Sequence, residues 1–597
     1  MKRLFLSIAF ISSVLMANAQ SKNYKIHSHN DYHQSTPFWT AYSNGAESIE
    51  IDLVIEQGKL YVAHEVSSVQ VNRTIESLYL ESLEKAIQLG IGKAKGLSFL
   101  IDLKSNANQS MELLLPVLKK YERLIKEQEI TFVISGNKPD TKVFEQYPYY
   151  VKLDHQSLTP LKNAMLWERV AMVSLNFKDY SVWNGKGRMV EEERQKLQEV
   201  IDLVHKQGKQ VRFWGTPDGK TAFKAFYDMG IDVINTDNPY LAQTYLKNLD
   251  RAVYHNTTVS EVYKPTFAND DKDVPIKNVI LLIGDGNGLT QISSSALANG
   301  GDLSLLQLKS VGFIKTQAGD DFTTDSAAAG TALATGQKTY NRSIGMGMDG
   351  MPLKNMTEYL APFNYKTGVI TTDELTGATP SAFYAHQKDR DDSSLIAQDL
   401  LKSQLSLFVG GGRKSFNNVN LKQEFTLLEQ VEQLSTSKDA RVGYFLAEGG
   451  LKGVIEGRTD VLAESTKHSL DFLSKGDQPF FLMVEGAKID SYGHFNNTGG
   501  IVTEGIDFDK AITEALKFAD KDGQTLVIIT ADHETGGFAI PQGDVKQGII
   551  EGDFISHDHT GTMVPIFAYG PKSGEFRGAY ENNEVYHKII KLLNLDN

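Results

Sequence analysis

Three unbroken apolar runs in the second half of the chain, each ending in an acidic residue, constrain the fold more than any other feature. The runs begin at Asn278, Phe480 and Thr525, and they end at Asp285, Glu485 and Asp532-His533. Continuous apolar runs of this length are typical of strands buried on both faces of a parallel sheet. The carboxyl ends of such strands lie at the ligand-binding edge of the sheet. Because a buried, unpaired acid is costly, we expect a cation beside these carboxylates.

A run of small residues, Thr324 to Gly336, follows the first of these strands and contains Asp325-Ser326 at its start. Its composition predicts a helix packed closely against a sheet, with Thr324 or Asp325 as the N-cap. The free N–H groups and positive dipole end of a helix suit a serine that attacks and then carries a phosphoryl group. Ser326 is therefore the candidate nucleophile, and plain helix capping is the alternative interpretation.

Further potential metal ligands follow in two short segments, Asp490-Ser-Tyr-Gly-His494 and His557-Asp-His559. Aspartate and histidine are suitable zinc ligands. A lone histidine is usually structural or exposed. These histidines, however, occur close to aspartates in the sequence and together with acidic residues at the ends of predicted strands. The combination predicts a zinc-binding site.

Together these segments resemble the alkaline phosphatase family, from Asn278 to the C-terminus. The shared motifs are Gly284-Asp285-Gly286, Thr324-Asp325-Ser326-Ala327, Ala378-Thr379-Pro380 with Arg390, Gly410-Gly411-Gly412, Glu485 to His494, Thr530 to His533 and His559-Thr560-Gly561. The resemblance implies an α/β/α sandwich with a central, mostly parallel sheet. It also implies hydrolysis of phosphate monoesters through a phosphoserine. A relative with the same metal pair that acts on phosphodiesters, phosphonates or sulfate esters is the alternative.

The same resemblance implies the metal ligands. It assigns Asp490, His494 and His559 to one Zn²⁺, Asp285, Asp532, His533 and the Ser326 oxygen to a second, and Asp285, Thr379 and Glu485 to one Mg²⁺. Arg390 would bind the phosphate as a two-pronged donor. The chain departs from the family at Gly377, where an Asp or His is common. Because groups around the ligands tune metal affinity, this departure should loosen the magnesium site.

The first part of the chain alternates short β-rich runs with helical patterns. We expect eight strands, near 24–27, 48–53, 97–103, 130–135, 149–153, 170–175, 211–214 and 233–235. Eight strands separated by helices predict a (β/α)8 barrel, a TIM-like fold whose active sites lie at the C-terminal ends of the strands.

Polar residues gather at those predicted strand ends. The alternation Glu50-Ile-Asp52 places both carboxylates on one face of a strand, and Asp102 could add a third oxygen ligand for a hard divalent cation. His29 and His64 could serve as general acid and base, and Lys104 could bind phosphate oxygens. A barrel whose charged strand ends are merely solvated or salt-bridged is the alternative.

These residues, with the closing segment Gly230 to Pro239, resemble the superfamily of glycerophosphodiester phosphodiesterases and phosphatidylinositol-specific phospholipases C. The resemblance implies one Ca²⁺ or Mg²⁺ on Glu50, Asp52 and Asp102, and cleavage of a phosphodiester with His29 and His64 moving protons. The usual His-Arg-Gly opening is replaced here by His29-Asn-Asp. A barrel that only binds a ligand is therefore a further alternative.

We expect the chain as a whole to be an exported two-domain enzyme. Residues 1–19 have the three parts of a signal peptide, which predicts a periplasmic or secreted protein. We expect the barrel over 20–246, a polar linker over 247–276 and the phosphatase domain over 277–597. The net charge of −13 argues against nucleic acid as a partner. Small-molecule phosphate esters are the expected partners, with no transmembrane segment and with a homodimer as one possible assembly.

Overall fold

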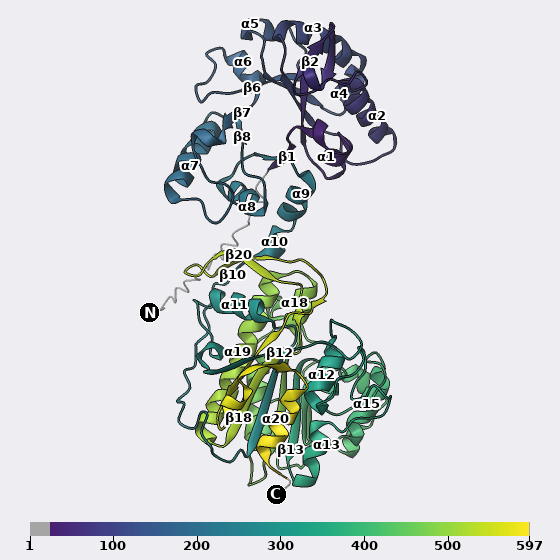
Figure 1. The fold of residues 1–597 in the computed structure, drawn as a ribbon, viewed down its shortest axis with the longest axis vertical. Coiled ribbons are helices and arrows are strands. Elements are labelled where there is room, and N and C mark those ends of the chain that lie inside the picture. The colour runs from purple at the N-terminus through teal and green to yellow at the C-terminus, as the bar shows by residue number, and fades with distance from the viewer. Residues whose placement is uncertain (1–23, 596–597) are drawn as a thin grey trace, which may run out of the picture. The chain divides into compact units, whose positions relative to one another are not determined.

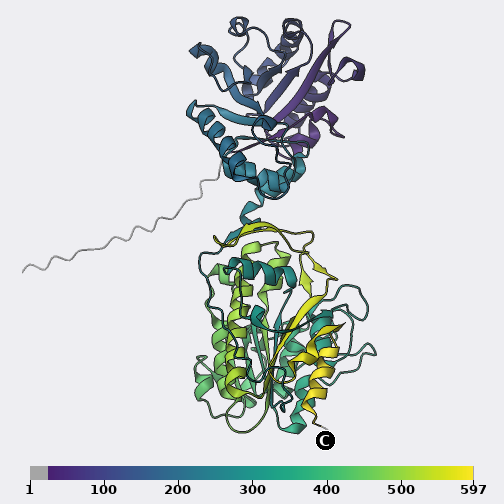
Figure 2. The same cartoon turned by 60° about the vertical axis from the view of Figure 1, so that its left-hand side comes forward.

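The computed structural model describes residues 24–595 and divides into two compact units, Met1–Asn248 and Leu249–Asn597. The predicted signal peptide lies outside the described residues. Within the described part, no helix has both the length and the apolar character that crossing a membrane requires. Figures 1 and 2 show the two units, each with its own sheet.

The N-terminal unit is a closed barrel of eight parallel strands, as the sequence predicts. The strands are β1 (Lys25–Ser28), β2 (Ser48–Glu56), β4 (Ser98–Leu103), β5 (Thr131–Gly136), β6 (Val151–His155), β7 (Val170–Asn176), β8 (Gln210–Trp214) and β9 (Val233–Thr236). Strand β1 pairs with both β9 and β2, which closes the barrel. The sequence reading missed β3 (Lys59–Val62), which forms an antiparallel hairpin with β2.

Helices connect the barrel strands and bury one face each. They are α1 (Trp39–Ser43), α2 (Glu81–Gln88), α3 (Ala107–Lys120), α4 (Glu122–Glu127), α5 (Thr141–Phe144), α6 (Ala164–Arg169), α7 (Glu191–Lys206), α8 (Lys220–Met229) and α9 (Pro239–Lys247). The buried side chains of Leu100, Val133, Met172 and Val233, from β4, β5, β7 and β9, form one cluster. Strands that far apart meet only inside the barrel, so these side chains fill its interior.

The second unit contains a ten-stranded, mostly parallel sheet, also as predicted. Its order is β15-β16-β14-β13-β17-β11-β18-β23-β12-β24. The strands are β11 (Asn278–Gly284), β12 (Ser310–Lys315), β13 (Lys366–Glu374), β14 (Leu407–Gly411), β15 (Thr426–Leu428), β16 (Val442–Phe445), β17 (Phe480–Gly486), β18 (Thr525–Ala531), β23 (Val564–Tyr569) and β24 (Gly578–Glu581). Strand β23 is antiparallel to both β18 and β12.

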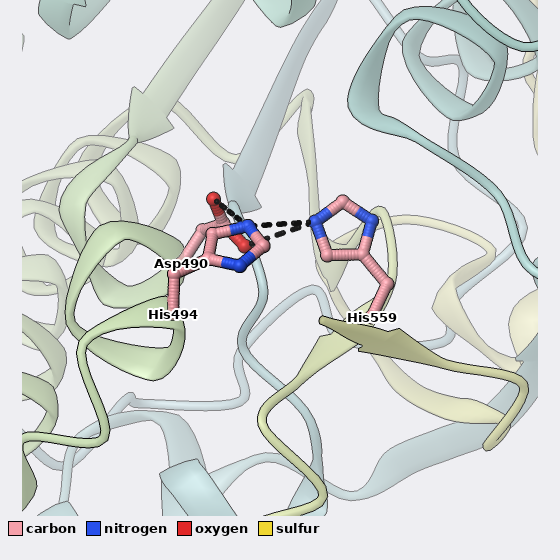
Figure 3. A group of neighbouring side chains, drawn as sticks. All are labelled: Asp490, His494 and His559. Carbon is pink, nitrogen blue, oxygen red and sulfur yellow. Dashed lines mark hydrogen bonds and ion pairs between the residues drawn. The ribbon is translucent and has the colours of Figure 1, made fainter. Parts of the chain in front are cut away.

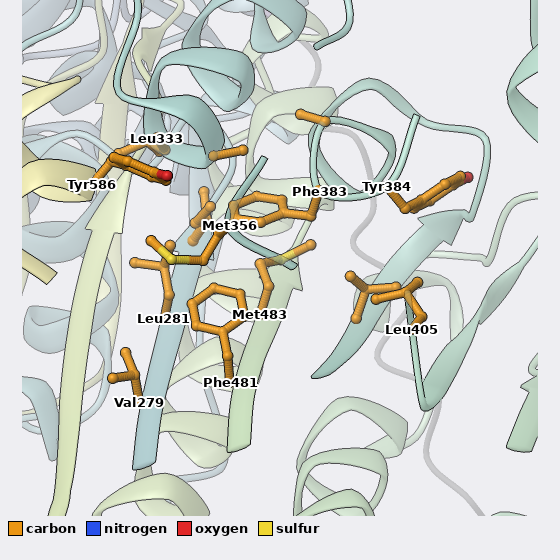
Figure 4. Packing of buried hydrophobic residues seen from close by; sticks show 14 of the residues in the cluster. Val279, Leu281, Leu333, Met356, Phe383, Tyr384, Leu405, Phe481, Met483 and Tyr586 are labelled. Carbon is orange, nitrogen blue, oxygen red and sulfur yellow. The ribbon is translucent and has the colours of Figure 1, made fainter. Parts of the chain in front are cut away.

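Helices cover both faces of this sheet (Figure 2). They are α10 (Leu249–Ala252), α11 (Leu289–Ala298), α12 (Ser326–Thr335), α13 (Met356–Leu360), α14 (Ala378–Ser381), α15 (Ser393–Lys402), α16 (Gln433–Thr436), α17 (Val461–Leu473), α18 (Lys488–His494), α19 (Thr498–Asp522) and α20 (Glu584–Leu593). Alternate residues of β11 enter different cores. Leu281 packs in one cluster with Phe481 and Met483, as Figure 4 shows, and Leu282 packs in the other. This double burial explains why the strand is apolar throughout.

The predicted linker, residues 247–276, is largely folded against the second unit. It contains α10 and β10 (Val253–His255), and β10 pairs antiparallel with β21 (Ile549–Asp553), which also pairs with β20 (Ala539–Asp544). The hydroxyl of Tyr263 donates to Asp520 Oδ2 at 2.7 Å. Low periodicity therefore marked a segment with little regular structure, yet its side chains are anchored to α19.

Candidate metal centres

The three apolar strands that end in acids are neighbours, with β11 between β17 and β18. Ile283 pairs with Glu485 on one side and with Thr530 on the other. The parallel register therefore brings Asp285, Glu485 and Asp532 to one edge of the sheet, as the sequence pattern predicts.

Helix α12 places Ser326 at the same edge. Asp325 is its N-cap and accepts from the Ala328 N–H at 2.9 Å. The small side chains allow close packing, because a Cβ on Gly330 would lie 3.4 Å from the Cα of Thr379 in α14. Ser326 Oγ lies 3.2 Å from Nε2 of His533. Capping and nucleophile are thus compatible roles of adjacent residues.

Asp325 also orients the candidate phosphate-binding arginine. Its Oδ2 accepts from Arg390 Nη1 at 3.1 Å and from the backbone N–H of Arg342 at 3.0 Å. Arg342 has a positive φ of 73°, unusual for a residue with a side chain. No feature of the sequence near Arg342 indicates that its backbone N–H donates to Asp325.

The first ligand cluster consists of Asp490, His494 and His559 (Figure 3). The two imidazole Nε2 atoms lie 3.1 Å apart, and each lies 3.3 Å from a carboxylate oxygen of Asp490. The Nδ1 atoms contact backbone oxygens, His494 that of His557 and His559 that of Thr324 at 2.8 Å. Because a carbonyl only accepts, Nδ1 of each ring carries a proton, and Nε2 is the atom of each ring that faces Asp490 and could bind a metal ion.

The second cluster consists of Asp285, Asp490 and His533, so Asp490 belongs to both. Nε2 of His533 lies 3.4 Å from Asp285 Oδ1 and 3.3 Å from Asp532 Oδ2. Strand β19 (Glu534–Thr535) follows His533 and pairs antiparallel with β22 (His559–Thr560). This pairing brings segments more than twenty residues apart to the same cluster.

The two carboxylates beside His533, those of Asp285 and Asp532, fit a bound cation. Burial, followed by the charge of Asp532, raises the pKa of Asp285 well above its usual range. Burial and the charge of Asp490 raise the pKa of Asp532 to about 7. Asp285 Oδ1 and Asp532 Oδ2 are buried and accept no hydrogen bond. A divalent cation would neutralise these charges and use the two free oxygens, so the donor set fits a metal pair.

The predicted magnesium ligands are less tightly grouped. Thr379 Oγ1 donates to Asp285 Oδ2 at 3.4 Å, while Glu485 belongs to none of the three ligand clusters found among residues 24–595. Burial raises the pKa of Glu485 to about 8. Its Oε2 accepts from Thr371 Oγ1, a contact that the sequence reading missed. At Gly377, a Cβ would lie 3.6 Å from an oxygen of Asp373.

The barrel brings its predicted carboxylates together as well. Glu50, Asp52 and Asp102 contribute oxygens that lie within 4.8 Å of one another. Asp52 and Asp102 pair in register on β2 and β4, and each retains a buried Oδ1 that accepts no hydrogen bond. Lys104 Nζ lies 3.1 Å from Asp52 Oδ2 and 2.8 Å from Asp102 Oδ2. The free oxygens fit one hard cation, and Lys104 compensates part of the remaining charge.

Glu50 has two buried partners that the sequence reading missed. Its Oε2 lies 2.7 Å from Arg212 Nη2 and 2.8 Å from His27 Nε2. Burial would raise the pKa of Glu50, but Arg212 and then His27 outweigh it and lower the pKa to about 2. A charged residue inside the apolar run Val211-Arg212-Phe213 was the available signal.

The two predicted barrel histidines each contact an acid. His29 Nδ1 lies 2.7 Å from Asp237 Oδ1, and His64 Nδ1 lies 2.8 Å from Asp52 Oδ2. Burial opposes protonation of His29, but the hydrogen bond to Asp237 and the charges of Glu50 and Asp237 together outweigh it and raise the pKa of the imidazole. The Tyr32 hydroxyl, also missed, donates to Asp52 Oδ2 at 2.8 Å.

The second unit has the architecture of an α/β metallohydrolase, because its ligand clusters surround a serine hydroxyl at the carboxyl edge of a mostly parallel sheet. The family model described as alkaline phosphatase matches residues 276–550 and 550–595, more than half of the 597-residue chain. The chain therefore belongs to the alkaline phosphatase family.

Individual relatives agree with this assignment. Alkaline phosphatase 4 of Bacillus subtilis (strain 168) is 31% identical in an alignment of 436 residues that covers 58% of this chain and 94% of the relative. Alkaline phosphatase of Escherichia coli (strain K12) is 29% identical over 54% of this chain and 87% of its own length. The solved alkaline phosphatase from the Antarctic bacterium TAB5 is 40% identical with a TM-score of 0.51, over 54% of this chain and 98% of that one.

The N-terminal region has separate matches. The model for the AIM6-like phosphodiesterase domain matches residues 17–95, and the model for the glycerophosphoryl diester phosphodiesterase family matches residues 210–240. The chain thus combines an alkaline phosphatase domain with a phosphodiesterase-like barrel.

Proposed function

We propose that the second unit hydrolyses phosphate monoesters through a phosphoserine at Ser326. The observation that carries the proposal is the position of Ser326 Oγ, 3.2 Å from Nε2 of His533 at the edge of two ligand clusters. A hydroxyl that only capped the helix would not need imidazole and carboxylate ligands around it, since Asp325 already caps α12.

The residues that would hold zinc are those of the two clusters, with Asp532 and Ser326 added beside His533. Asp490, His494 and His559 would hold one ion, and Asp285, Asp532, His533 and Ser326 would hold the other. When bound, such ions lower the pKa of a neighbouring hydroxyl and stabilise negative charge on oxygen. Asp285, Thr379 and Glu485 would hold magnesium, and Gly377 has no side chain that could help to orient these ligands.

The protein's own groups then position the phosphoryl group. Ser326 Oγ loses its proton to water and forms a bond to phosphorus as the bond to the ester oxygen breaks, and the departing oxygen takes a proton from water to leave as the alcohol. The N-terminus of the ten-residue helix α12 favours the negative charge on the phosphoryl oxygens. Arg390, held by Asp325, would donate two hydrogen bonds to those oxygens. Water then breaks the Oγ–P bond and releases phosphate.

We propose further that the barrel is a second active site, for phosphodiesters. Glu50, Asp52 and Asp102 would hold one Ca²⁺ or Mg²⁺, which neutralises phosphate charge when bound. His29 and His64, each oriented by an acid, would take a proton from the attacking water and give one to the departing ester oxygen. Cleavage of a diester gives a monoester, the substrate class of the other unit.

The fusion thereby suits release of phosphate from organic phosphates. The signal-peptide pattern of residues 1–19 supports export to the periplasm or outside the cell. N-terminal sequencing of the protein recovered from outside the cytoplasm should begin at Gln20. Recovery only in the cytoplasm with Met1 retained would contradict export.

The decisive experiment measures a chromogenic monoester and the matching diester with Zn²⁺, Mg²⁺ and Ca²⁺ supplied. We expect Ser326→Ala to abolish monoester turnover and to retain diester cleavage, which Glu50→Ala should then remove. Ser381→Ala is a matched control, because Ser381 is a buried serine whose hydroxyl donates to the Ala378 carbonyl.

The other outcomes discriminate between the proposals. Loss of both activities in Ser326→Ala would leave the barrel as a binding module. Faster turnover of a sulfate ester than of the phosphate monoester would contradict the monoesterase proposal and favour a sulfatase-like activity.

A further inference from the structure

We infer that Thr535 is a positioning residue whose hydroxyl links the two candidate metal clusters. This inference rests on the proposed metal binding and identifies a group that connects the ligands of the two clusters. Thr535 is fully buried in β19, two residues after His533. Its Oγ1 donates to Asp490 Oδ1 and lies 3.2 Å from Nδ1 of His533. One hydroxyl thus contacts the shared ligand and a ligand of the second cluster.

The hydrogen-bond inventory fixes the direction of both contacts. A hydroxyl has one proton, and a carboxylate can only accept, so the Thr535 proton points to Asp490. The lone pair of Oγ1 must then accept from Nδ1–H of His533. The His533 Nε2 consequently carries a lone pair, directed toward Asp285, Asp532 and Ser326. The hydroxyl therefore selects the tautomer that can bind a metal ion.

The position of Thr535 is fixed by two close backbone approaches. A Cβ on Gly493 would lie 2.8 Å from the Thr535 methyl carbon, and a Cβ on Gly286 would lie 2.8 Å from its Oγ1. Gly493 precedes His494 in α18, and Gly286 follows Asp285. Only glycine leaves room for the threonine at these two points.

Cross-strand pairing completes the link. Thr535 pairs with His559, a ligand of the first cluster. Thr535 is thus next to every segment that carries a ligand of the two clusters. It reaches these segments through the chain itself, strand pairing, a hydrogen bond or close packing against a glycine. Such outer groups commonly change metal affinity by 10- to 100-fold when removed.

Metal binding by the full chain tests this inference without relying on activity. After removal of metal by a chelator, Co²⁺ binding is followed by visible absorption and Zn²⁺ affinity by competition with a chromogenic chelator. We expect Thr535→Val, which keeps the shape but lacks the hydroxyl, to weaken Zn²⁺ binding by about tenfold or more and to change the Co²⁺ spectrum. Thr535→Ser should restore both.

A matched control and a second pair of variants separate the hydroxyl from packing. Thr466→Val removes a buried hydroxyl that donates to Leu462 O in α17, and it should leave Zn²⁺ affinity unchanged. Should Thr535→Val fail to fold, the comparison of Thr535→Ser with Thr535→Ala decides, since these variants differ by the hydroxyl alone.

Three results would overturn the inference. In the first, Thr535→Val binds Zn²⁺ within twofold of the wild type, or Thr535→Ala binds it within twofold of Thr535→Ser. Thr466→Val could lose as much affinity as Thr535→Val. Absence of Zn²⁺ and Co²⁺ binding by the wild-type chain would instead refute the metal-dependent function, and this inference with it.

Discussion

Asp325 shows how much one carboxylate can organise around a reactive serine. One oxygen caps α12, and the other accepts from the side chain of Arg390 and the backbone of Arg342. The same residue therefore fixes the start of the helix, the position of Ser326 and the direction of the guanidinium. Stability and phosphate binding should depend on it together.

We expect Asp325→Ala to lower the free energy of unfolding by about 1 kcal/mol through loss of the cap. It should also raise KM for a phosphate monoester by roughly tenfold, since the freed Arg390 loses a charge-assisted hydrogen bond worth about 1.5–3 kcal/mol. Calorimetry and steady-state kinetics measure the two effects. Asp391→Ala is the control, because the exposed carboxylate of Asp391 pairs with the guanidinium of Arg342 and not with Arg390. An unchanged KM would show that Arg390 keeps its position without Asp325.

His27 predicts a pH dependence of barrel stability. Its Nδ1 lies 2.7 Å from Ser48 Oγ and its Nε2 lies 2.8 Å from Glu50 Oε2. Burial, and then the charge of Arg212, lowers the pKa of His27 to about 4. In the unfolded chain a histidine titrates near its ordinary pKa of about 6.5. Between these values the unfolded state binds more protons, so the free energy of unfolding should fall as pH falls from about 6.5 to about 4.

The expected loss is on the order of 3 kcal/mol over that window, at about 1.4 kcal/mol per pKa unit. Tryptophan fluorescence in urea measures it selectively, because all four tryptophans, Trp39, Trp167, Trp183 and Trp214, belong to the barrel. His27→Asn should flatten the pH slope, whereas His33→Asn, at an exposed position, should not. Equal slopes in wild type and His27→Asn would contradict the assignment.

At the scale of elements, the contact between α12 and α14 limits side-chain size at Gly330. A Cβ there would lie 3.4 Å from both the Cβ of Ala382 and the Cα of Thr379. Gly330→Ala should be nearly neutral, because better helix propensity, worth up to about 1 kcal/mol, offsets the tight contact. Gly330→Leu should destabilise by about 1–3 kcal/mol through overpacking. Differential scanning calorimetry measures both variants, and an unchanged melting temperature for Gly330→Leu would refute the close packing.

At the scale of the whole molecule, the division at Asn248 and Leu249 places β10 and the following segment with the phosphatase unit. Asp520 accepts from the hydroxyls of Tyr263 and Thr266, each at 2.7 Å. The Phe267 N–H donates to the Tyr569 hydroxyl at 3.0 Å. These contacts suggest that the segment stabilises the unit rather than merely joining two.

We therefore expect a fragment that begins at Leu249 to be more stable than one that begins at Lys277. With about 1 kcal/mol for each hydrogen bond lost, the difference should reach at least ~2 kcal/mol. Urea unfolding followed by circular dichroism compares the fragments. A fragment from Asp271, which lacks Tyr263 and Thr266 but retains the residues just before β11, serves as an intermediate. Equal urea midpoints for all three fragments would show that the segment before β11 does not stabilise the unit and is only a linker.

Much of this architecture was determined by the sequence itself, because strand burial leaves a local signature. The eight barrel strands and the three apolar strands of the large sheet were predicted from runs of adjacent residues. The same runs placed Asp285, Glu485 and Asp532 at strand ends, and the alternation in β2 placed Glu50 and Asp52 on one face. The proximity of these acids followed from the rule that parallel strands end at a common edge.

The tertiary structure alone decided which groups complete each site. Arg212 reaches Glu50 across 162 residues of sequence, and Thr535 reaches Asp490 across 45. Such contacts depend on strand order, register and backbone approaches at residues such as Gly493, none of which leaves a periodic pattern. Local periodicity reports which face of an element is buried, whereas a hydrogen bond between distant residues exists only once the chain has folded.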